Sequence, residues 1–153
     1  SIDDMNRIIV DEDVSEEGNA TENQEKATLV TEDTLLSQSK EACQEVGKNV
    51  VMYGHIEPDA VDYYQFTVTQ KTTVGIYCLI EKTDITDYNK FSFSIYSKTE
   101  DKLISASDYV LTGDYHSYYT QKVFEPGTYY ITPYYSATGA SQSIPYYLQV
   151  MQN

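Results

Sequence analysis

Histidine and cysteine, which can serve in catalysis and in metal binding, are rare in this sequence. It contains two histidines, His55 and His116, and two cysteines, Cys43 and Cys78. The histidines lack the H-x-x-x-H spacing that directs two imidazoles to one metal, and no glycine-rich phosphate loop or G-x-S-x-G nucleophile turn is present. The 24 acids would allow a glycosidase-like carboxylate pair, but so many acids make any single pair uninformative. The sequence therefore predicts a protein that is not an enzyme.

Acidic side chains dominate the charge, which is −14 over 153 residues. Such a surface excludes nucleic acid and anionic membranes as partners, because both require Lys and Arg. It suits cation binding, or simply solubility. No apolar run is long enough to span a bilayer. Since the chain starts at Ser1 instead of Met, we expect a mature or truncated form of a secreted or cell-surface protein, with any export signal removed.

The elements that would position these side chains are short strands from residue 48 onward. Apolar residues alternate with polar ones in sets such as Tyr64, Phe66 and Val68, or Phe91, Phe93 and Ile95. Turn signals such as Glu57-Pro58-Asp59 and Glu125-Pro126-Gly127 separate them. About eight evenly spaced strands predict an all-β fold, an antiparallel, jelly-roll-like β-sandwich over residues 48–153.

The first third of the chain has a different pattern. Residues 1–20 are predicted to be an acidic, flexible tail whose one apolar patch, Ile8-Ile9-Val10, would either dock on the body or fray. Residues 21–47 are predicted to be a linker whose positions 33–46 form one short helix on the sandwich, ended by Gly47.

Cysteine positions leave two alternatives. Cys78 shares a strand face with Val74, Ile76 and Ile80, which predicts a small core residue. The alternative is one disulfide between Cys43 and Cys78.

Tyrosine is the most distinctive component, with sixteen copies, all from Tyr53 onward. Strand alternation directs Tyr129 inward, and Tyr130, Tyr134 and Tyr147 outward. Outward tyrosines would form a ligand-binding patch, because tyrosine offers a large contact area with few rotors and a polar tip. The alternative is that they are ordinary exposed strand residues whose cross-strand pairs stabilise the sheet.

Four segments, in this order, resemble the bacterial pre-peptidase C-terminal domains and the related collagen-binding domains of bacterial collagenases. They are Gly54-His55-Ile56, Asp62 to Val68, Pro126 to Ile131 and Tyr146 to Val150. The resemblance covers residues 16–151. It implies a non-catalytic jelly-roll module of a secreted bacterial protein, and in the collagen-binding branch an aromatic sheet face.

The resemblance also implies a calcium site. Many relatives open with Glu-Pro-Asn-Asp/Asn-Ser/Thr, and Glu17-Gly18-Asn19-Ala20-Thr21 is similar to a degraded copy. The matching ligands would be Glu17, Asn19, Asp59 and Asp62, whose oxygens suit Ca²⁺. Gly18 and Ala20 depart from the pattern, which puts the ligand number in doubt. Without calcium, Asp59 would lie in a turn and Asp62 would accept hydrogen bonds at a strand start.

Together these features predict a monomeric accessory module that binds an extracellular protein or polysaccharide through a tyrosine-rich sheet face, with a structural calcium ion. The first alternative is a spacer, or a domain that aids folding or secretion of a larger protein and has no ligand. The second is a carbohydrate-binding module proper.

Overall fold

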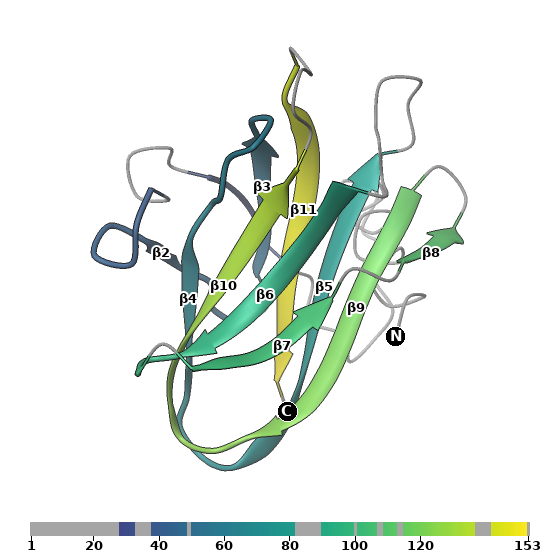
Figure 1. The fold of residues 1–153 in the computed structure, drawn as a ribbon. Helices are drawn as coiled ribbons and strands as arrows, with labels where there is room; N and C mark the ends of the chain where they lie inside the picture. The colour runs from purple at the N-terminus through teal and green to yellow at the C-terminus, as the bar shows by residue number, and fades with distance from the viewer. Residues whose placement is uncertain are drawn as a thin grey trace.

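Two β-sheets packed face to face form the body of the protein in a computed structural model (Figure 1). The structure describes residues 28–32, 38–48, 50–81, 90–99, 101–106, 109–112, 115–136 and 142–152. The larger sheet has the strand order β1-β3-β11-β5-β9-β8, and the smaller sheet has the order β2-β4-β10-β6-β7. The predicted all-β sandwich is therefore confirmed.

The strands are short at the edges of the sheets and long at their centres. In the six-stranded sheet they are β1 (Thr28–Thr31), β3 (Val50–Ile56), β5 (Thr72–Glu81), β8 (Tyr109–Thr112), β9 (Tyr115–Phe124) and β11 (Ile144–Gln152). In the five-stranded sheet they are β2 (Gln44–Glu45), β4 (Tyr64–Val68), β6 (Phe91–Ser97), β7 (Lys102–Ala106) and β10 (Gly127–Tyr135).

Most neighbouring strands are antiparallel, but β1 pairs with β3 and β2 pairs with β4 in parallel. The segment that contains β1 and β2 therefore contributes one edge strand to each sheet. Its hydrogen bonds continue past the strands, since Glu32 N–H donates to the carbonyl of Tyr53 and Val46 N–H donates to the carbonyl of Gln65. Thr28 pairs with Val50 at the start of β3, and Gln149 near the end of β11 pairs with Val51.

Side chains alternate between the two faces of each strand, and the inward-facing aliphatic and aromatic ones fill the space between the sheets. The alternating sets identified in the sequence are buried as predicted: Tyr64, Phe66, Val68, Val74, Ile76, Cys78, Ile80, Phe91, Phe93, Ile95, Tyr129, Ile131, Tyr146, Leu148 and Val150. Phe66, Phe124 and Tyr129 pack as an aromatic triad with ring centroids 4.8–5.5 Å apart. Burial of such rings supplies much of the stabilisation of a sandwich of this size.

The helix predicted over residues 33–46 is wrong where the structure describes it. Residues 38–43 form bends and an isolated bridge, and Gln44 and Glu45 form β2. Val46 is buried against the sandwich, and its backbone bond to Gln65 is available only to an extended chain. Tertiary pairing thus overrides the local helical spacing. Positions 33–37 lie outside the described residues.

Two further expectations can be compared with the structure. The disulfide alternative is wrong, because Cys43 and Cys78 are both free thiols, the second of them in the core. The predicted number of about eight strands is too low, because β1, β2 and β8 were not foreseen. Within the described residues, no helix has the length and apolar character to cross a membrane.

Candidate functional site

Two carboxylates and two tyrosine hydroxyls meet at one end of the sandwich. Glu32 directly follows β1, and Asp62 precedes β4. Tyr64 opens β4 in the five-stranded sheet, and Tyr146 lies on β11 in the six-stranded sheet. Both tyrosines are fully buried, so their hydroxyls bring polar groups to the margin of an apolar core. We call Glu32, Asp62, Tyr64 and Tyr146 the carboxylate–tyrosine cluster.

Short hydrogen bonds connect the cluster. The hydroxyl of Tyr64 donates to Glu32 Oε2 at 2.8 Å, and that of Tyr146 donates to Asp62 Oδ2 at 2.6 Å. The two hydroxyl oxygens are themselves 2.6 Å apart, and Tyr146 Oη also lies 3.2 Å from Glu32 Oε2. The backbone N–H of His55 donates to Glu32 Oε1 at 3.3 Å. Glu32 therefore accepts bonds from both sheets.

A count of protons constrains the ionisation of this cluster. The path Glu32–Tyr64–Tyr146–Asp62 contains three short oxygen–oxygen contacts, each of which needs one shared proton. The two hydroxyls carry only two protons. In the absence of a cation, the third proton must come from a carboxyl group at one end of the path.

The electrostatics agree with this count. Burial raises the pKa of Asp62 to about 7, with further contributions from the neighbouring carboxylates of Glu32 and Glu57, against a lowering by the hydrogen bond from Tyr146. Burial also raises the pKa of the Tyr146 and Tyr64 hydroxyls, which therefore remain protonated donors. Asp62 is thus the carboxyl group that we expect to hold the third proton near neutral pH. In that protonated form it donates to Tyr146, which donates to Tyr64, in place of the bond from Tyr146 to the ionised carboxylate.

Gly54 makes room for the cluster. A Cβ atom at this position would lie 2.9 Å from both Cζ and Oη of Tyr146, and 3.0 Å from the carboxyl carbon of Glu32. Real Cβ contacts essentially never reach 2.9 Å. The glycine of the Gly54-His55-Ile56 segment is therefore required by close packing between β3, β11 and Glu32.

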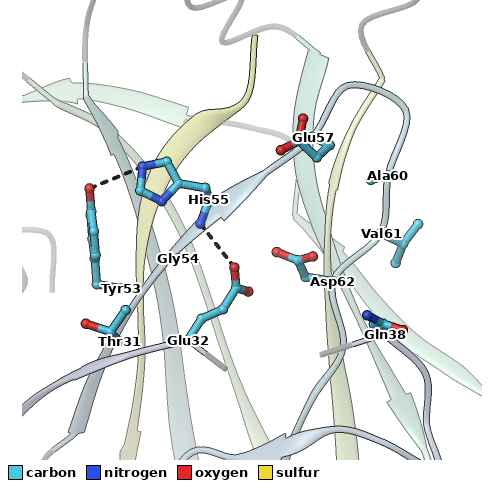
Figure 2. A pocket seen from close by; sticks show the side chains of 10 residues that line it. All are labelled: Thr31, Glu32, Gln38, Tyr53, Gly54, His55, Glu57, Ala60, Val61 and Asp62. Carbon is cyan, nitrogen blue, oxygen red and sulfur yellow. Dashed lines mark hydrogen bonds between the residues drawn. The ribbon is translucent and has the colours of Figure 1, made fainter. Parts of the chain in front are cut away.

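A cavity of about 440 Å³ opens beside the cluster. Figure 2 shows Glu32 and Asp62 directing their carboxylates toward one another from opposite sides of this cavity, with Glu57 above them. The ring of His55 turns away toward Tyr53, whose hydroxyl lies 3.5 Å from Nε2. The lining consists of Thr31, Glu32, Gln38, Tyr53, Gly54, His55, Glu57, Ala60, Val61 and Asp62. Such an oxygen-rich site suits a proton or a hard cation better than covalent catalysis.

Of the four calcium ligands expected from the sequence, the structure describes Asp59 and Asp62. Asp62 lies in the cluster, whereas Asp59 lies in a turn, has a left-handed backbone (φ 58°) and donates its N–H to the carbonyl of Tyr135. Glu17 and Asn19 lie outside the described residues. The described part of the chain contains no group of three acidic, His or Cys side chains arranged to hold a metal. Two carboxylates face this cavity, whereas Ca²⁺ takes six to eight oxygen ligands.

Sequence reasoning missed Glu32 as the partner of Asp62. The signal available was weak, because Glu32 directly follows the Thr-Leu-Val-Thr segment, a strand-like pattern of only four residues. The parallel pairing of β1 with β3 determines the position of Glu32. Parallel strands are joined by long connections, so their pairing cannot be read from a local sequence pattern.

The three tyrosines expected to bind a ligand do not form one patch. Tyr130 and Tyr134 lie on β10, on the outer face of the five-stranded sheet, as the burial of Tyr129, Ile131 and Tyr135 requires. Tyr147 lies on β11 and faces outward from the six-stranded sheet. The sandwich therefore presents these side chains on opposite sides.

On the five-stranded sheet, Tyr130 pairs across strands with Tyr96. The ammonium of Lys40 lies 5.3 Å from the ring centroid of Tyr96 and 5.6 Å from that of Tyr130, so one cation contacts both rings. Tyr134 pairs with Ser92 on one side and forms an isolated bridge with Val61 on the other. We call Lys40, Tyr96, Tyr130 and Tyr134 the β10 aromatic face.

Comparison with solved structures identifies the fold. The chain is similar to the pre-peptidase C-terminal domain of collagenase from Bacillus anthracis, with a TM-score of 0.52 and 17% identity over 84% of this chain and all of that domain. A second similar structure is a cycloisomaltooligosaccharide glucanotransferase from Paenibacillus, with a TM-score of 0.37 and 15% identity over 61% of this chain and 13% of that one. No family model and no curated protein sequence matches the chain. The first similarity confirms, at the level of the fold, the resemblance seen in the sequence.

Proposed function

We propose that this chain is a non-catalytic accessory module of an exported protein and binds an extracellular protein or polysaccharide through the β10 aromatic face. The observation that carries the proposal is the Tyr96–Lys40–Tyr130 arrangement, in which a cation and two rings form one surface on a sheet. Half-buried tyrosines held in a sheet contact a ligand at low entropic cost. The fold shared with a collagenase domain supports the same class of function.

The chemistry of the face favours a ligand with an extended, hydrogen-bonding surface. Tyr130 and Tyr134 lie two pleats apart on β10, with Thr132 between them and Ser94 opposite Thr132. Spaced rings on a pleated strand match polymers such as extended peptides, triple helices and glycans, whose repeating units bring polar and apolar groups to the surface.

A binding assay with wild-type protein and matched variants tests this proposal. The full chain is incubated with fibrillar collagen, gelatin, cellulose and chitin, and the bound fraction is measured after sedimentation. The Tyr130→Ala/Tyr134→Ala variant should lose binding to any polymer that the wild type retains, by about tenfold or more if these rings are binding hot spots.

The control is Val123→Ala, on β9 of the other sheet, where the side chain is exposed. This variant should bind like the wild type. Equal binding by the double tyrosine variant would refute the proposal. If the wild type retains none of the four polymers, the proposal fails for these ligand classes, and the spacer or folding-domain alternative is favoured.

We also propose that calcium stabilises the carboxylate–tyrosine cluster, with Asp62 and Glu32 as ligands and with Glu17 and Asn19 as candidates for the remaining oxygens. The support is that Glu32 and Asp62 face one cavity, where burial and the neighbouring carboxylates of Glu32 and Glu57 raise the pKa of Asp62. A divalent cation would replace the shared proton and remove the repulsion between the two carboxylates.

Thermal unfolding of the full chain in EDTA and in millimolar calcium tests this second proposal. Linkage predicts about 2.7 kcal/mol of stabilisation at a hundredfold excess over Kd. Asp62→Asn should abolish the effect, and Glu125→Gln, a substitution at an exposed carboxylate, should preserve it. A calcium response that survives in Asp62→Asn, or its absence from the wild type, would refute the site.

A further inference from the structure

The outer surface of the five-stranded sheet is rich in hydroxyl groups along its central strand. On β10 the side chains of Tyr129, Ile131 and Tyr135 are buried in the core, so the alternate positions face outward. These outward positions are Thr128, Tyr130, Thr132 and Tyr134. All four side chains carry a hydroxyl, which donates and accepts hydrogen bonds without carrying a charge.

The two strands beside β10 continue this composition. On β6 the outward positions are Ser92, Ser94 and Tyr96, and on β4 they are Gln65 and Thr67. Across the outward positions of these three strands, all of which the structure describes, there are hydroxyl groups and one amide but no charged side chain. This is a selective composition in a chain that contains 24 acids and 10 bases.

The tyrosine rings form two separate platforms on this surface. Tyr96 and Tyr130 are cross-strand neighbours, whereas Tyr134 lies four residues beyond Tyr130 on β10, a distance of about 14 Å along a strand. Thr132 and Ser94 pair with each other in the row between the platforms and have much smaller side chains. A ligand that contacts both platforms is therefore longer than one sugar ring or one amino-acid side chain.

Charges beside this surface are few and of both signs. The ammonium of Lys40 lies over the rings of Tyr96 and Tyr130, and the exposed Glu45 on β2 pairs with Gln65. A polyanion would be repelled by the net charge of −14. A polycation would meet no carboxylate on β4, β6 or β10. The charge distribution thus favours an uncharged ligand.

We infer that the ligand of the β10 aromatic face is a neutral polysaccharide, an inference that rests on the proposed function and narrows it. A sugar ring has an apolar C–H face that packs on tyrosine, and hydroxyl groups that exchange hydrogen bonds with serine, threonine and glutamine. The ammonium of Lys40 can donate to the same sugar oxygens. A protein ligand is disfavoured, because its charged side chains would lose water against a surface that offers them no opposite charge.

Sedimentation with two classes of polymer tests the inference. The full chain is incubated with the neutral polysaccharides cellulose, chitin and granular starch, and with fibrillar collagen and gelatin. At least one polysaccharide should retain the wild type about tenfold more strongly than either protein polymer does. Retention should be the same at low and high salt, because screening has little effect on an uncharged ligand.

Two pairs of substitutions identify the contact. Tyr130→Ala/Tyr134→Ala should lower the retention by about tenfold or more. Tyr130→Phe/Tyr134→Phe keeps both rings, and should lower it by about threefold to tenfold through the loss of two hydroxyl groups. The matched control is Tyr119→Phe/Tyr147→Phe on the other sheet, which should bind like the wild type. Circular dichroism verifies that each variant is folded.

The outcomes distinguish this inference from the proposed function. Retention by collagen or gelatin alone, lost in Tyr130→Ala/Tyr134→Ala, would overturn the inference and leave the proposed function standing. Retention that falls with salt, or that is undiminished in Tyr130→Phe/Tyr134→Phe, would also overturn it, since the ligand would then be recognised through charge or through apolar contact alone. Retention by none of the five polymers, or retention that the alanine variant leaves unchanged, would overturn both.

Discussion

The hydroxyl oxygens of Tyr64 and Tyr146 lie 2.6 Å apart, although the two residues belong to different sheets. Their rings meet edge to face with centroids 6.4 Å apart, so the hydroxyls converge at the margin of the core. Each hydroxyl also reaches a carboxylate. The pair is therefore a buried polar connection between the two layers, and the amide of Gln152 on β11, which donates to the carbonyl of Thr67 on β4, is a second polar connection between them.

Removal of these hydroxyls should have unequal effects. Tyr146 contacts Asp62 and Glu32 as well as Tyr64, whereas Tyr64 contacts Glu32 and Tyr146. We expect Tyr64→Phe to lower the free energy of unfolding by about 1–2 kcal/mol, and Tyr146→Phe to lower it more, because two half-buried carboxyl groups lose a hydrogen-bond partner. Urea unfolding of both single variants and the double variant measures this. Fully additive losses would contradict a connected path.

The stability of the calcium-free protein should fall as pH rises. Asp62 has a pKa of about 7 when folded, above the value of about 3.9 expected in the unfolded chain. Protonation therefore favours the folded state, and its contribution is complete below about pH 4 and is lost progressively up to about pH 7. Because Asp62 is partly open to solvent, we expect a loss on the order of 1–2 kcal/mol.

Urea unfolding in EDTA between pH 4.5 and pH 7.5 measures this dependence. Asp62→Asn should flatten the curve, because the titrating group is gone. Asp101→Asn, at an exposed turn, should retain the slope of the wild type. A wild-type stability that rises across this range would contradict a protonated Asp62.

Gly54→Ala should be strongly destabilising. The added methyl group would meet Tyr146 and Glu32 at 2.9–3.0 Å, so the cluster would have to shift. We expect a loss of about 1–3 kcal/mol in chemical denaturation, as for other overpacked sites. The matched control is Gly47→Ala, whose Cβ would make an ordinary contact with Val50 at 3.9 Å. A similar loss in both variants would show that the glycine content, and not the close approach, is what matters.

Phe66→Ala should cost about 3–5 kcal/mol, because it removes the ring that contacts both Phe124 and Tyr129 and leaves a cavity between the sheets. Val123→Ala, at a side chain that is 52% exposed, should change stability by less than about 0.5 kcal/mol. Guanidinium unfolding of both variants measures the difference. A small loss in Phe66→Ala would mean that the aromatic triad is not a principal part of the core.

The two thiols should react at very different rates. Cys78 is fully buried, and burial raises the pKa of its thiol, so the reactive thiolate is scarce and inaccessible. Cys43 is only partly buried, and its Sγ lies 3.3 Å from the carbonyl of Lys40. A thiol reagent should modify Cys43 first in the native protein and both residues after denaturation. Detection of fewer than two thiols in the unreduced denatured protein would indicate a disulfide.

Strand periodicity made most of the sandwich predictable from the sequence. Alternation over Tyr64 to Val68 and over Phe91 to Ile95 identifies which residues face the core, and the structure confirms this assignment. Tyr147 was also correctly directed outward, but alternation within one strand does not reveal which sheet the strand joins. For that reason Tyr130 and Tyr147 were expected to lie on one patch, whereas they lie on opposite sides.

The edge strands and the carboxylate–tyrosine cluster were less predictable. β2 has only two residues, and its helical spacing gives way to backbone pairing with β4. Glu32 and Asp62 are separated by thirty positions in sequence and converge only because β1 pairs in parallel with β3. Asp62 itself was identified through the family resemblance, and its partner through the structure.

The pairing of Thr28 with Val50 and of Gln149 with Val51 has a mechanical consequence. Both ends of the described body lie at the same end of the strands of the six-stranded sheet, two strand positions apart, which is about 10 Å. Tension applied through these two ends would peel β1 from β3 one hydrogen bond at a time, instead of loading the pairs together in shear. Under load, the strand that precedes Glu32 would be the first to detach, and the carboxylate–tyrosine cluster would open before the core does.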